Sequence, residues 1–285
     1  MQWGVGSETG VLTDVLLCRP DHYDWIPTNV VAKAALAAGE KPEPAEVAAQ
    51  FRELESALDT ASVRRHYLTP DPHLPYQVYT RDSSQMTPWG AVVTQLFRPQ
   101  RRGEYASILE FYQSAGIPIW GYATHGSLEG GDIHIIRPGL ALIGHSGERT
   151  SEVGARQFAG WLEDAAGWEV RLYPFAEHFL HLDLLFCMVT DGLALVCEDV
   201  LEPDLLNWID ARGIRRLPVS YRDAMALGAN ILALGNDRVI SPAHQTGLND
   251  RLRAEGIEVL APAFDLLTRG GGGVHCATMP LNRLD

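Results

Sequence analysis

Side chains that can do chemistry recur at nearly equal intervals along this chain of 285 residues. They begin five similar stretches of sequence, at Asp82, Glu129, His181, Asn230 and Cys276. The successive spacings are 47, 52, 49 and 46 residues. A cysteine becomes a nucleophilic thiolate near neutral pH when a base or a positive neighbour assists it, and His181 is the obvious candidate. These residue types therefore indicate a nucleophilic thiol with an acid–base partner.

Cys276 differs from the other cysteines because four glycines, at positions 270–273, precede it. Glycine allows positive φ and has no side chain, so such a run is typical of a tight loop or of close approach to another group. A flexible hinge beside a structural cysteine is the alternative, and the run alone does not separate the two. The other cysteines lie in apolar runs without CxxC spacing and are expected to be buried, at Cys18, Cys187 and Cys197.

The acidic residues of these stretches need a positive partner. Asp183 stands two residues after His181, and on a strand both side chains would point to the same side, toward the centre. Several carboxylates around one thiol repel each other, and a planar guanidinium would relieve this because its donors pair bidentately with carboxylates. Asp82 and Asp183 would hold its edges, while Glu129 would bind it or orient His181. For Asp82 and Glu129 taken singly, turn capping is the alternative.

The elements that must position these residues repeat with them. Each motif residue is followed by an apolar strand, a turn, a second strand, an amphipathic helix and a third strand. We expect helices near residues 45–60, 103–114, 151–165, 203–211 and 247–255, and a strand at 11–17 that completes the fifth module. Five ββαβ modules closed head to tail predict a pseudo-fivefold α/β propeller, in a single catalytic domain of residues 1–285. A doubly wound α/β fold is the alternative.

Composition narrows the classes of function. The net charge of −13 argues against nucleic-acid binding and is compatible with a cationic substrate. No apolar run reaches the ~18 residues of a membrane span, and the N-terminus has no signal-peptide pattern, so a cytoplasmic protein is expected. The chain has two lysines and no GxxxxGK(S/T) motif, which nearly excludes a lysine nucleophile or a P-loop lysine. We expect neither a metal nor a cofactor.

Four motifs in this order resemble the guanidino-group modifying enzymes, which include arginine deiminase, dimethylarginine dimethylaminohydrolase, arginine dihydrolase, agmatine deiminase and the amidinotransferases. The motifs are Tyr-Thr-Arg-Asp82, Glu129-Gly-Gly-Asp132, His181-Leu-Asp183 and Gly-Gly-Gly-Val-His-Cys276. The family fold is the same propeller. The resemblance implies that Cys276 is the nucleophile, His181 the general acid/base and Glu129 its partner. It also implies substrate-binding residues, namely Asp82 and Asp183 for the guanidinium, Arg101 and Arg149 for a carboxylate, and more loosely Asn29.

Some features depart from parts of this family. Arginine deiminases usually carry a helical insertion, for which 285 residues leave no room, and the size is nearer the dimethylarginine hydrolases and the dihydrolase domain. The His181-Leu-Asp183 pattern is that of the deiminases. Asp82, where the dihydrolases have asparagine, favours a single deimination. Two carboxylate-binding arginines favour an amino-acid substrate over agmatine.

We therefore expect a cysteine-dependent hydrolase of arginine or an N-substituted arginine. It would form an S-alkylthiouronium intermediate and release citrulline with ammonia or an alkylamine. An amidinotransferase that passes the amidino group to an amine stays open, and a non-catalytic binding propeller is the third possibility. The expected partner is a small guanidino compound, and a homodimer is left open. We expect His275 to face away from Cys276 and Asp132 to position a loop or a carboxylate, whereas Asn230 has no assigned role.

Overall fold

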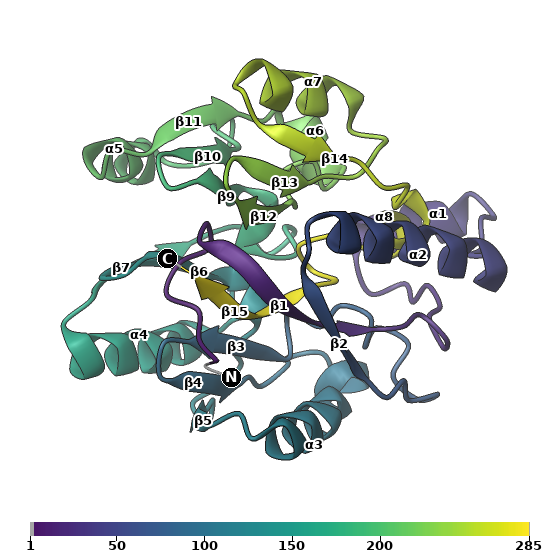
Figure 1. Ribbon diagram of the computed structural model, residues 1–285, viewed down its shortest axis with the longest axis horizontal. Coiled ribbons are helices and arrows are strands. Elements are labelled where there is room, and N and C mark those ends of the chain that lie inside the picture. Colours follow the sequence, from purple (N-terminus) through teal and green to yellow (C-terminus); the bar gives the residue numbers. More distant parts are fainter. Residues whose placement is uncertain (1–2, 285) are drawn as a thin grey trace.

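The computed structural model describes residues 3–284. Five three-stranded sheets surround a common centre, and the longer helices lie outside them (Figure 1). In each sheet the first two strands of the module pair antiparallel, and the third pairs parallel with the second. The predicted pseudo-fivefold α/β propeller is therefore confirmed, and the doubly wound alternative is wrong.

Four of the sheets are built from consecutive strands. The first two modules contain β3 (Ser84–Thr87), β4 (Gly90–Val93) and β5 (Ile119–Tyr122), then β6 (Ile133–Arg137), β7 (Leu140–His145) and β8 (Glu169–Pro174). The next two contain β9 (Phe186–Thr190), β10 (Leu193–Val196) and β11 (Arg215–Pro218), then β12 (Leu232–Gly235), β13 (Arg238–Ile240) and β14 (Glu258–Leu260). Nearly all residues of the first two strands of each module are buried, as strands near the middle of a propeller must be.

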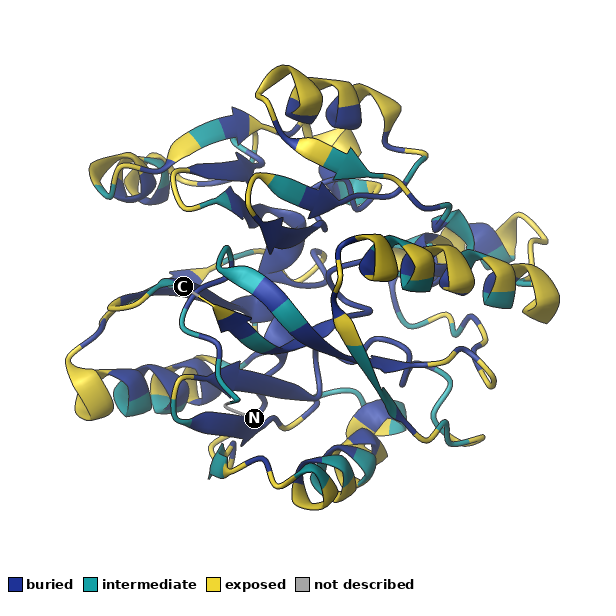
Figure 2. Ribbon diagram, in the orientation of Figure 1, coloured by how far each residue is buried: buried dark blue, intermediate teal, exposed yellow. Residues whose placement is uncertain are grey.

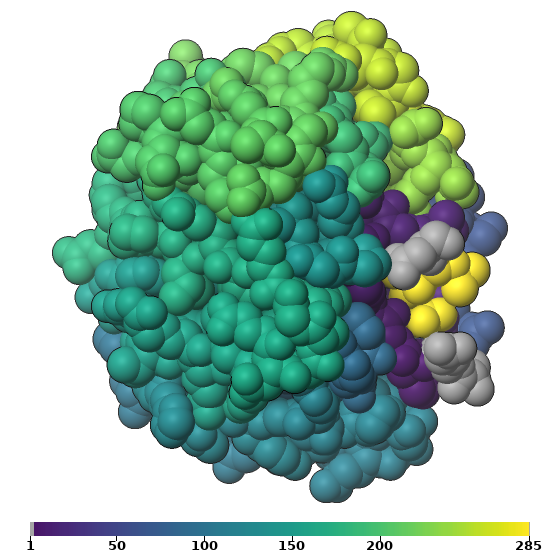
Figure 3. All heavy atoms as spheres, turned by 90° about the vertical axis from the view of Figure 1, so that its left-hand side faces the viewer, coloured from purple at the N-terminus to yellow at the C-terminus, as the bar shows by residue number. Residues whose placement is uncertain are grey.

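The fifth sheet joins the two ends of the chain. It contains β15 (Met279–Leu284), β1 (Val11–Cys18) and β2 (Arg64–Leu68). Val11 pairs with Leu284 and Leu16 with Met279, so the N-terminal strand completes the last module as predicted. Figure 3 shows the same junction at the surface, where purple N-terminal atoms lie beside yellow C-terminal atoms. Backbone hydrogen bonds between the two chain ends thus close the ring.

Helices connect the second and third strand of each module. They are α2 (Pro44–Thr60), α3 (Tyr105–Ala115), α4 (Glu152–Ala166), α5 (Pro203–Ala211) and α7 (Thr246–Ala254). These agree with the expected ranges, except that a 3-10 helix, η1 (Pro99–Glu104), precedes α3. Shorter elements lie in the connections, namely α1 (Val30–Ala37), α6 (Tyr221–Met225), α8 (Asp265–Gly270), η2 (Gly130–Asp132) and η3 (Leu182–Leu184). Over residues 3–284, no helix is long and apolar enough to cross a lipid bilayer.

The helix α4 illustrates why these segments form the outer layer. Its buried residues include Ala155, Phe158, Ala159 and Leu162, which follow the spacing of one helical face. The side chain of Ser151 caps its N-terminus by accepting a hydrogen bond from the backbone of Gly154. Figure 2 shows the consequence for the outer helices, whose faces toward solvent are exposed, while the first two strands of each module are mostly buried.

The motif residues lie on turns between elements rather than on strands. Glu129 and His181 are the N-cap residues of η2 and η3, and Cys276 lies in a turn before β15. We predicted that His181 and Asp183 point to the same side because they stand two residues apart on a strand. That reason is wrong, because residues on a 3-10 turn do not alternate as strand residues do. Both side chains are nevertheless buried at the centre, where they contact different partners.

Candidate active site

Cys276 is buried and has two polar side chains beside its sulfur. The amide Nδ2 of Asn230 lies 3.2 Å from Sγ, and the thiol points to Asp183 Oδ2 at 3.5 Å. Burial, together with Asp183 and Asp82, raises the pKa of the Cys276 thiol well above its ordinary value. In the substrate-free site the sulfur is therefore a thiol, and a cation placed between the acids would favour the thiolate.

The four glycines before Cys276 are positions of close approach. Each has a different side chain where its Cβ would stand, and the pairs are Gly270 with Tyr23, Gly271 with Asn29, Gly272 with Tyr79 and Gly273 with Asn230. A Cβ would come within 2.4 Å of an atom of that side chain at every one of the four. Gly271 also has a φ of 108°, which L side chains rarely adopt. The run is packed tightly against the site, so the flexible-hinge interpretation does not fit.

His181 is paired with Glu129. Its Nε2 lies 2.7 Å from Glu129 Oε2, and its Nδ1 lies 3.6 Å from Asp82 Oδ1. Burial opposes protonation, but Asp82, Asp132 and Glu129 raise the pKa of His181 to about 9. Burial also opposes ionisation of Glu129, yet Arg149 and His181 hold the pKa of that carboxyl well below its usual range. The pair is therefore an imidazolium and a carboxylate at neutral pH, and the histidine can act as an acid.

The Glu129-Gly-Gly-Asp132 motif shapes the wall behind His181. A Cβ on Gly131 would lie 2.7 Å from the imidazole ring, and one on Gly130 would lie 2.0 Å from the carbonyl oxygen of Arg81. Asp132 Oδ1 accepts a hydrogen bond of 2.8 Å from the backbone N–H of Leu182, the residue after His181. The glycines let the ring approach the backbone, and Asp132 holds the segment that carries the histidine.

Asp82 and Asp183 each keep one buried oxygen without a hydrogen bond. The second oxygen of Asp82 bonds Arg101, and that of Asp183 bonds His275 Nδ1 at 2.8 Å. Among the described residues, neither Asp82 Oδ1 nor Asp183 Oδ1 has a hydrogen-bond partner. A buried carboxylate oxygen without a donor is costly, so these two atoms indicate where a ligand with N–H groups would bind.

The prediction that His275 faces away from Cys276 is wrong. It lies in the same turn as Cys276, and its Nδ1 bonds the Asp183 oxygen that also faces the thiol. Burial and Arg81 lower the pKa of His275, so a neutral ring donates to the carboxylate. Sequence reasoning treated residues 275 and 276 as neighbours on a strand, but on this turn both side chains reach the centre. His275 therefore orients Asp183.

The predicted arginines and Asn29 also lie at the centre. Arg101 bonds Asp82 Oδ2 at 2.5 Å and both oxygens of Glu104 at 2.7 and 2.9 Å. Arg149 Nη1 bonds Glu129 Oε2 at 2.9 Å. Asn29 caps α1 and donates from Nδ2 to the carbonyl of Gly270 at 3.0 Å, which ties α1 to the glycine run. The structure thus brings all eight predicted residues together.

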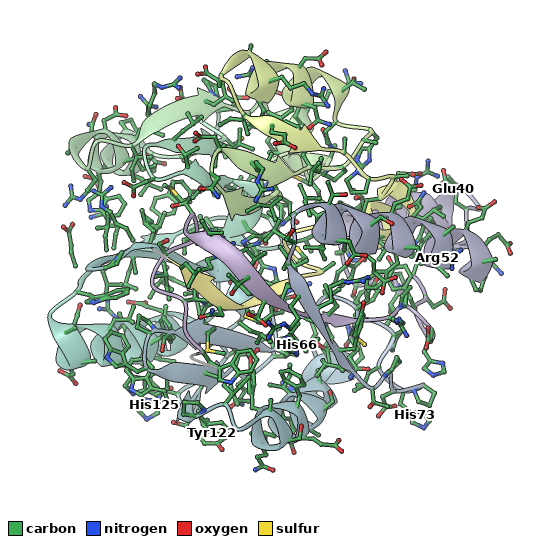
Figure 4. All side chains as sticks on the ribbon, in the orientation of Figure 1. Glu40, Arg52, His66, His73, Tyr122 and His125 are labelled. Atoms are coloured by element: carbon green, nitrogen blue, oxygen red, sulfur yellow. The ribbon has the colours of Figure 1, made fainter. Side chains whose placement is uncertain are left out.

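A narrow pocket joins these residues. It is lined by Asn29, Tyr76, Tyr79, Asp82, Arg101, Arg149, Leu180, His181, Gly270, Gly271 and Cys276. Glu129 and Asp183 contact lining residues from behind. His181 is buried, unlike His73 and His125, which Figure 4 labels at the outer surface. Because the lining residues come from all parts of the chain, the pocket exists only in the closed ring.

Sequence reasoning assigned no chemistry to three residues of this site. Asn230 was found by its spacing but left without a role, although it contacts the thiol. Glu104 binds Arg101, and its position three residues later is a pairing distance in a helical turn. Tyr76 shares the pocket wall with Tyr79. Its position three residues before the Tyr-Thr-Arg-Asp82 motif could have indicated that it belongs to the site.

Within residues 3–284, two groups of side chains have the spacing of metal ligands. Asp82, Glu129 and His181 place ligand atoms within 4.8 Å of one another, as do Glu8, Cys187 and His275. In the first group the two carboxylates already bind the guanidinium groups of Arg101 and Arg149, which would repel a divalent ion. The expectation of no metal and no cofactor stays a prediction.

Comparison with known proteins identifies the family. The arginine deiminase family model matches residues 44–216 and 215–283. The uncharacterized protein YkgA of Bacillus subtilis is 30% identical over 280 residues, covering 97% of this chain and 94% of that protein. The arginine deiminase of Listeria monocytogenes is 30% identical over 262 residues, covering 76% of this chain. The match spans 63% of the length of that enzyme.

Solved structures share the fold. DDAH from Pseudomonas aeruginosa, a cysteine-to-serine mutant in complex with citrulline, has a TM-score of 0.80 at 23% identity. That match covers 94% of this chain and 99% of DDAH. The N-terminal domain of ArgZ, a cyanobacterial arginine dihydrolase, has a TM-score of 0.81 at 20% identity and coverages of 95% and 98%. The chain belongs to the arginine deiminase family, within the guanidino-group modifying enzymes.

Proposed function

We propose that this protein hydrolyses the guanidinium group of arginine or an N-substituted arginine through a covalent bond to Cys276. The observation that carries the proposal is the pair of unbonded, buried oxygens, Asp82 Oδ1 and Asp183 Oδ1, next to a buried thiol. A guanidinium supplies planar N–H donors, which neither oxygen has as a hydrogen-bond partner, and a positive charge to pair with both carboxylates. The neighbouring DDAH structure contains citrulline, the product expected of such a reaction.

The bound cation would activate the nucleophile. Asp183 and Asp82 disfavour the thiolate in the free site. A guanidinium between them offsets their charge, lowers the pKa of Cys276 and releases the thiol proton to solvent. The sulfur then attacks the guanidinium carbon, so that a C–S bond forms and one C–N bond breaks.

His181 would serve first as an acid and then as a base. With a pKa of about 9 it is protonated at neutral pH and donates its proton to the departing nitrogen. The neutral imidazole then takes a proton from a water molecule that attacks the S-alkylthiouronium carbon. Collapse of this adduct releases citrulline and restores the thiol. Glu129 keeps the ring oriented throughout, through its contact with Nε2.

Arg101 and Arg149 are proposed to bind the substrate carboxylate. Both line the pocket. Among the described residues, Arg149 bonds a partner through Nη1 alone, so its other donors are available. Arg101 is held by Asp82 and Glu104 and adds its charge to the same wall. A substrate with an α-carboxylate is therefore favoured over agmatine.

The test uses Cys276→Ala and a panel of guanidino compounds. Arginine, methylated and hydroxylated arginines, agmatine and guanidinoacetate are each incubated with the protein, and the products are identified by mass. We expect citrulline from arginine or a substituted arginine, and a loss of at least about 10³-fold in Cys276→Ala because the covalent step is removed.

The control is Cys197→Ala, which removes a buried cysteine outside the pocket and should keep turnover within about threefold. Unchanged turnover in Cys276→Ala would refute the proposal. The panel is repeated with glycine present, because ornithine in place of citrulline would identify the amidinotransferase alternative.

A further inference from the structure

Asn230 makes three contacts with the turn that carries the thiol. Its Oδ1 accepts hydrogen bonds from the backbone N–H groups of His275 and Cys276, at 3.1 and 3.2 Å. Its Nδ2 lies 3.2 Å from Cys276 Sγ. The side chain is fully buried and belongs to the fourth module, directly before β12. One amide from a neighbouring module thus holds both the backbone and the sulfur of Cys276.

The orientation of this amide is determined by its partners. Two backbone N–H donors face one end of the Asn230 side chain, and only a carbonyl oxygen can accept from both. Turning the amide over would place its NH₂ against two donors. The NH₂ group therefore faces Cys276 Sγ and donates a hydrogen bond to it.

Gly273 makes this contact possible. A Cβ at position 273 would lie 2.3 Å from Asn230 Oδ1 and 2.9 Å from its Cβ. Any larger residue there would push the amide away from the turn. The last glycine of the run thereby admits Asn230 rather than providing flexibility.

The two polar side chains beside the sulfur respond in opposite ways when the thiol loses its proton. Asp183 Oδ2 accepts from the S–H group in the thiol form, and it repels the thiolate. The hydrogen bond from Asn230 Nδ2 to the sulfur becomes charge-assisted in the thiolate form, so it is stronger than the bond to the neutral thiol. Asp183 is present to bind a cation, so a neutral donor on the other side is needed to moderate its effect on the sulfur.

We propose that Asn230 is a catalytic residue that stabilises the Cys276 thiolate by donating from Nδ2, while its Oδ1 fixes the turn that aims the sulfur. This rests on the proposed role of Cys276 as the nucleophile. The same bond assists the last step, when the thiolate leaves the substrate carbon. No covalent chemistry occurs at Asn230 itself.

The test measures the thiol directly rather than turnover. Iodoacetamide alkylates Cys276 in the folded protein at several fixed pH values between about pH 7 and about pH 9, and the modified peptide is quantified by mass to give a profile of rate against pH, since alkylation requires the thiolate. Asn230→Asp keeps the oxygen that accepts from the turn but replaces the donor by a negative oxygen. The pKa of the thiol lies well above its ordinary value, so the rate in this range follows the small thiolate fraction. We expect the rate to fall about tenfold or more at each pH, which corresponds to a pKa higher by about one unit or more.

Asn249→Asp is the matched control. Asn249 is also a buried asparagine whose Nδ2 donates to a single acceptor, the carbonyl of Pro242, and it lies on α7 away from the pocket. Its profile should match the wild type. A folded Asn230→Asp protein with the wild-type profile would overturn the proposal.

Two further arms cover the case in which Asn230→Asp does not fold. Gly273→Ala should displace the amide without changing any charge and should slow alkylation in the same direction. In the wild type, selective ¹⁵N labelling of the six asparagines allows the Asn230 side-chain signal to be followed. We expect it to shift with the Cys276 titration, and a signal that does not shift contradicts the proposal.

These outcomes are separate from those of the proposed function. A thiol whose profile depends on Asn230 in a protein that processes no guanidino compound would refute the hydrolase proposal and keep the present one. If the protein forms citrulline but its alkylation profile does not depend on Asn230, the hydrolase proposal is supported and the proposal for Asn230 is refuted.

Discussion

The centre of the propeller contains two buried glutamate–histidine pairs. In the site pair, Glu129 and His181 are 2.7 Å apart. In the core pair, Glu8 and His134 are 3.1 Å apart. Both pairs are buried, both combine an acid with an imidazole, and each lies near a buried cysteine. Residue types alone would assign them the same chemistry.

Their surroundings differ. His181 lines a pocket that also contains Asp82 with its unbonded oxygen and the thiol of Cys276. The ring of His134 instead packs edge-on against Phe186, with centroids 5.3 Å apart, and stacks on His275 at 6.0 Å. The imidazole of the site pair faces a pocket that contains the thiol, whereas the imidazole of the core pair packs against two other rings. A small cavity also lies beside Glu8, but Cys187 in its wall donates to the carbonyl of Ile231. The site pair is therefore a candidate catalyst because of the groups beside its histidine, and not because space is left there alone.

The largest expected effect separates the two histidines. His181→Asn should reduce turnover by about 10³-fold, because on the proposed mechanism it removes the proton donor for the leaving nitrogen. His134→Asn should change turnover by less than tenfold but lower the free energy of unfolding by about 2 kcal/mol, because Glu8 loses its partner. Turnover assays and chemical denaturation of both variants provide the measurement. Equal losses of turnover in the two would break the comparison.

The second largest expected effect is a difference in how the two pairs change the free energy of unfolding with pH. Burial would raise the pKa of Glu8, but His134 lowers it to about 2, so its contribution is present above pH 4.5 and is lost as the pH falls toward 2. The pKa of His181 is raised from 6.5 to about 9, so its contribution is present below pH 6.5 and is lost as the pH rises toward 9. Each shift corresponds to roughly 3 kcal/mol.

Unfolding free energies measured across pH test this assignment. Glu8→Gln should reduce the slope of the acid limb of the stability profile and leave the alkaline limb, whereas His181→Asn should flatten the alkaline limb. Part of the acid limb should remain in Glu8→Gln, because the pKa of Glu129 is lowered as well. An acid limb that keeps its full slope in Glu8→Gln would show that the core pair is not acid-sensitive.

The smallest expected effect concerns the cysteine near the core pair. Cys187 donates from Sγ to the carbonyl of Ile231 at 3.4 Å, and burial with Glu8 and Asp183 raises its thiol pKa well above the ordinary value. Cys187→Ala should cost about 1 kcal/mol of stability and change turnover by less than twofold. Mass analysis after alkylation of the native protein should find Cys187 unmodified, and its modification at the rate of Cys276 would contradict the distinction.

Much of the fold could be predicted because its signals are local. The helix expected at 203–211 is α5, Pro203–Ala211, since a proline start and helical periodicity mark it within one stretch of sequence. The even spacing of Asp82, Glu129, His181, Asn230 and Cys276 predicted five modules, and each of these residues lies at the central end of one. The 3-10 turns at His181 and Glu129 were not predicted, because two or three residues are too few for a periodic signal.

The residues brought together at the site were predicted, but several of the contacts between them were not. Arg101 was predicted to bind a substrate carboxylate, but its pairing with Asp82 and Glu104 was not foreseen. His275 was expected to face away, yet it bonds Asp183, a residue 92 positions earlier. A hydrogen bond between two modules depends on the angle at which each turn presents its side chain, and residue types do not contain that angle.

The sequence by itself determined the number and order of the modules, the position of the thiol and the residue types that surround it. Patterns of apolar residues, turns and glycines are local, so they can be recognised before the chain is folded. Only the tertiary structure decided that the glycine run is packed rather than flexible, that Asn230 faces the sulfur, and that His181 faces a pocket with the thiol while His134 packs against other rings. Those outcomes depend on close packing between segments far apart in the chain, where differences of a few tenths of an ångström determine whether a side chain fits.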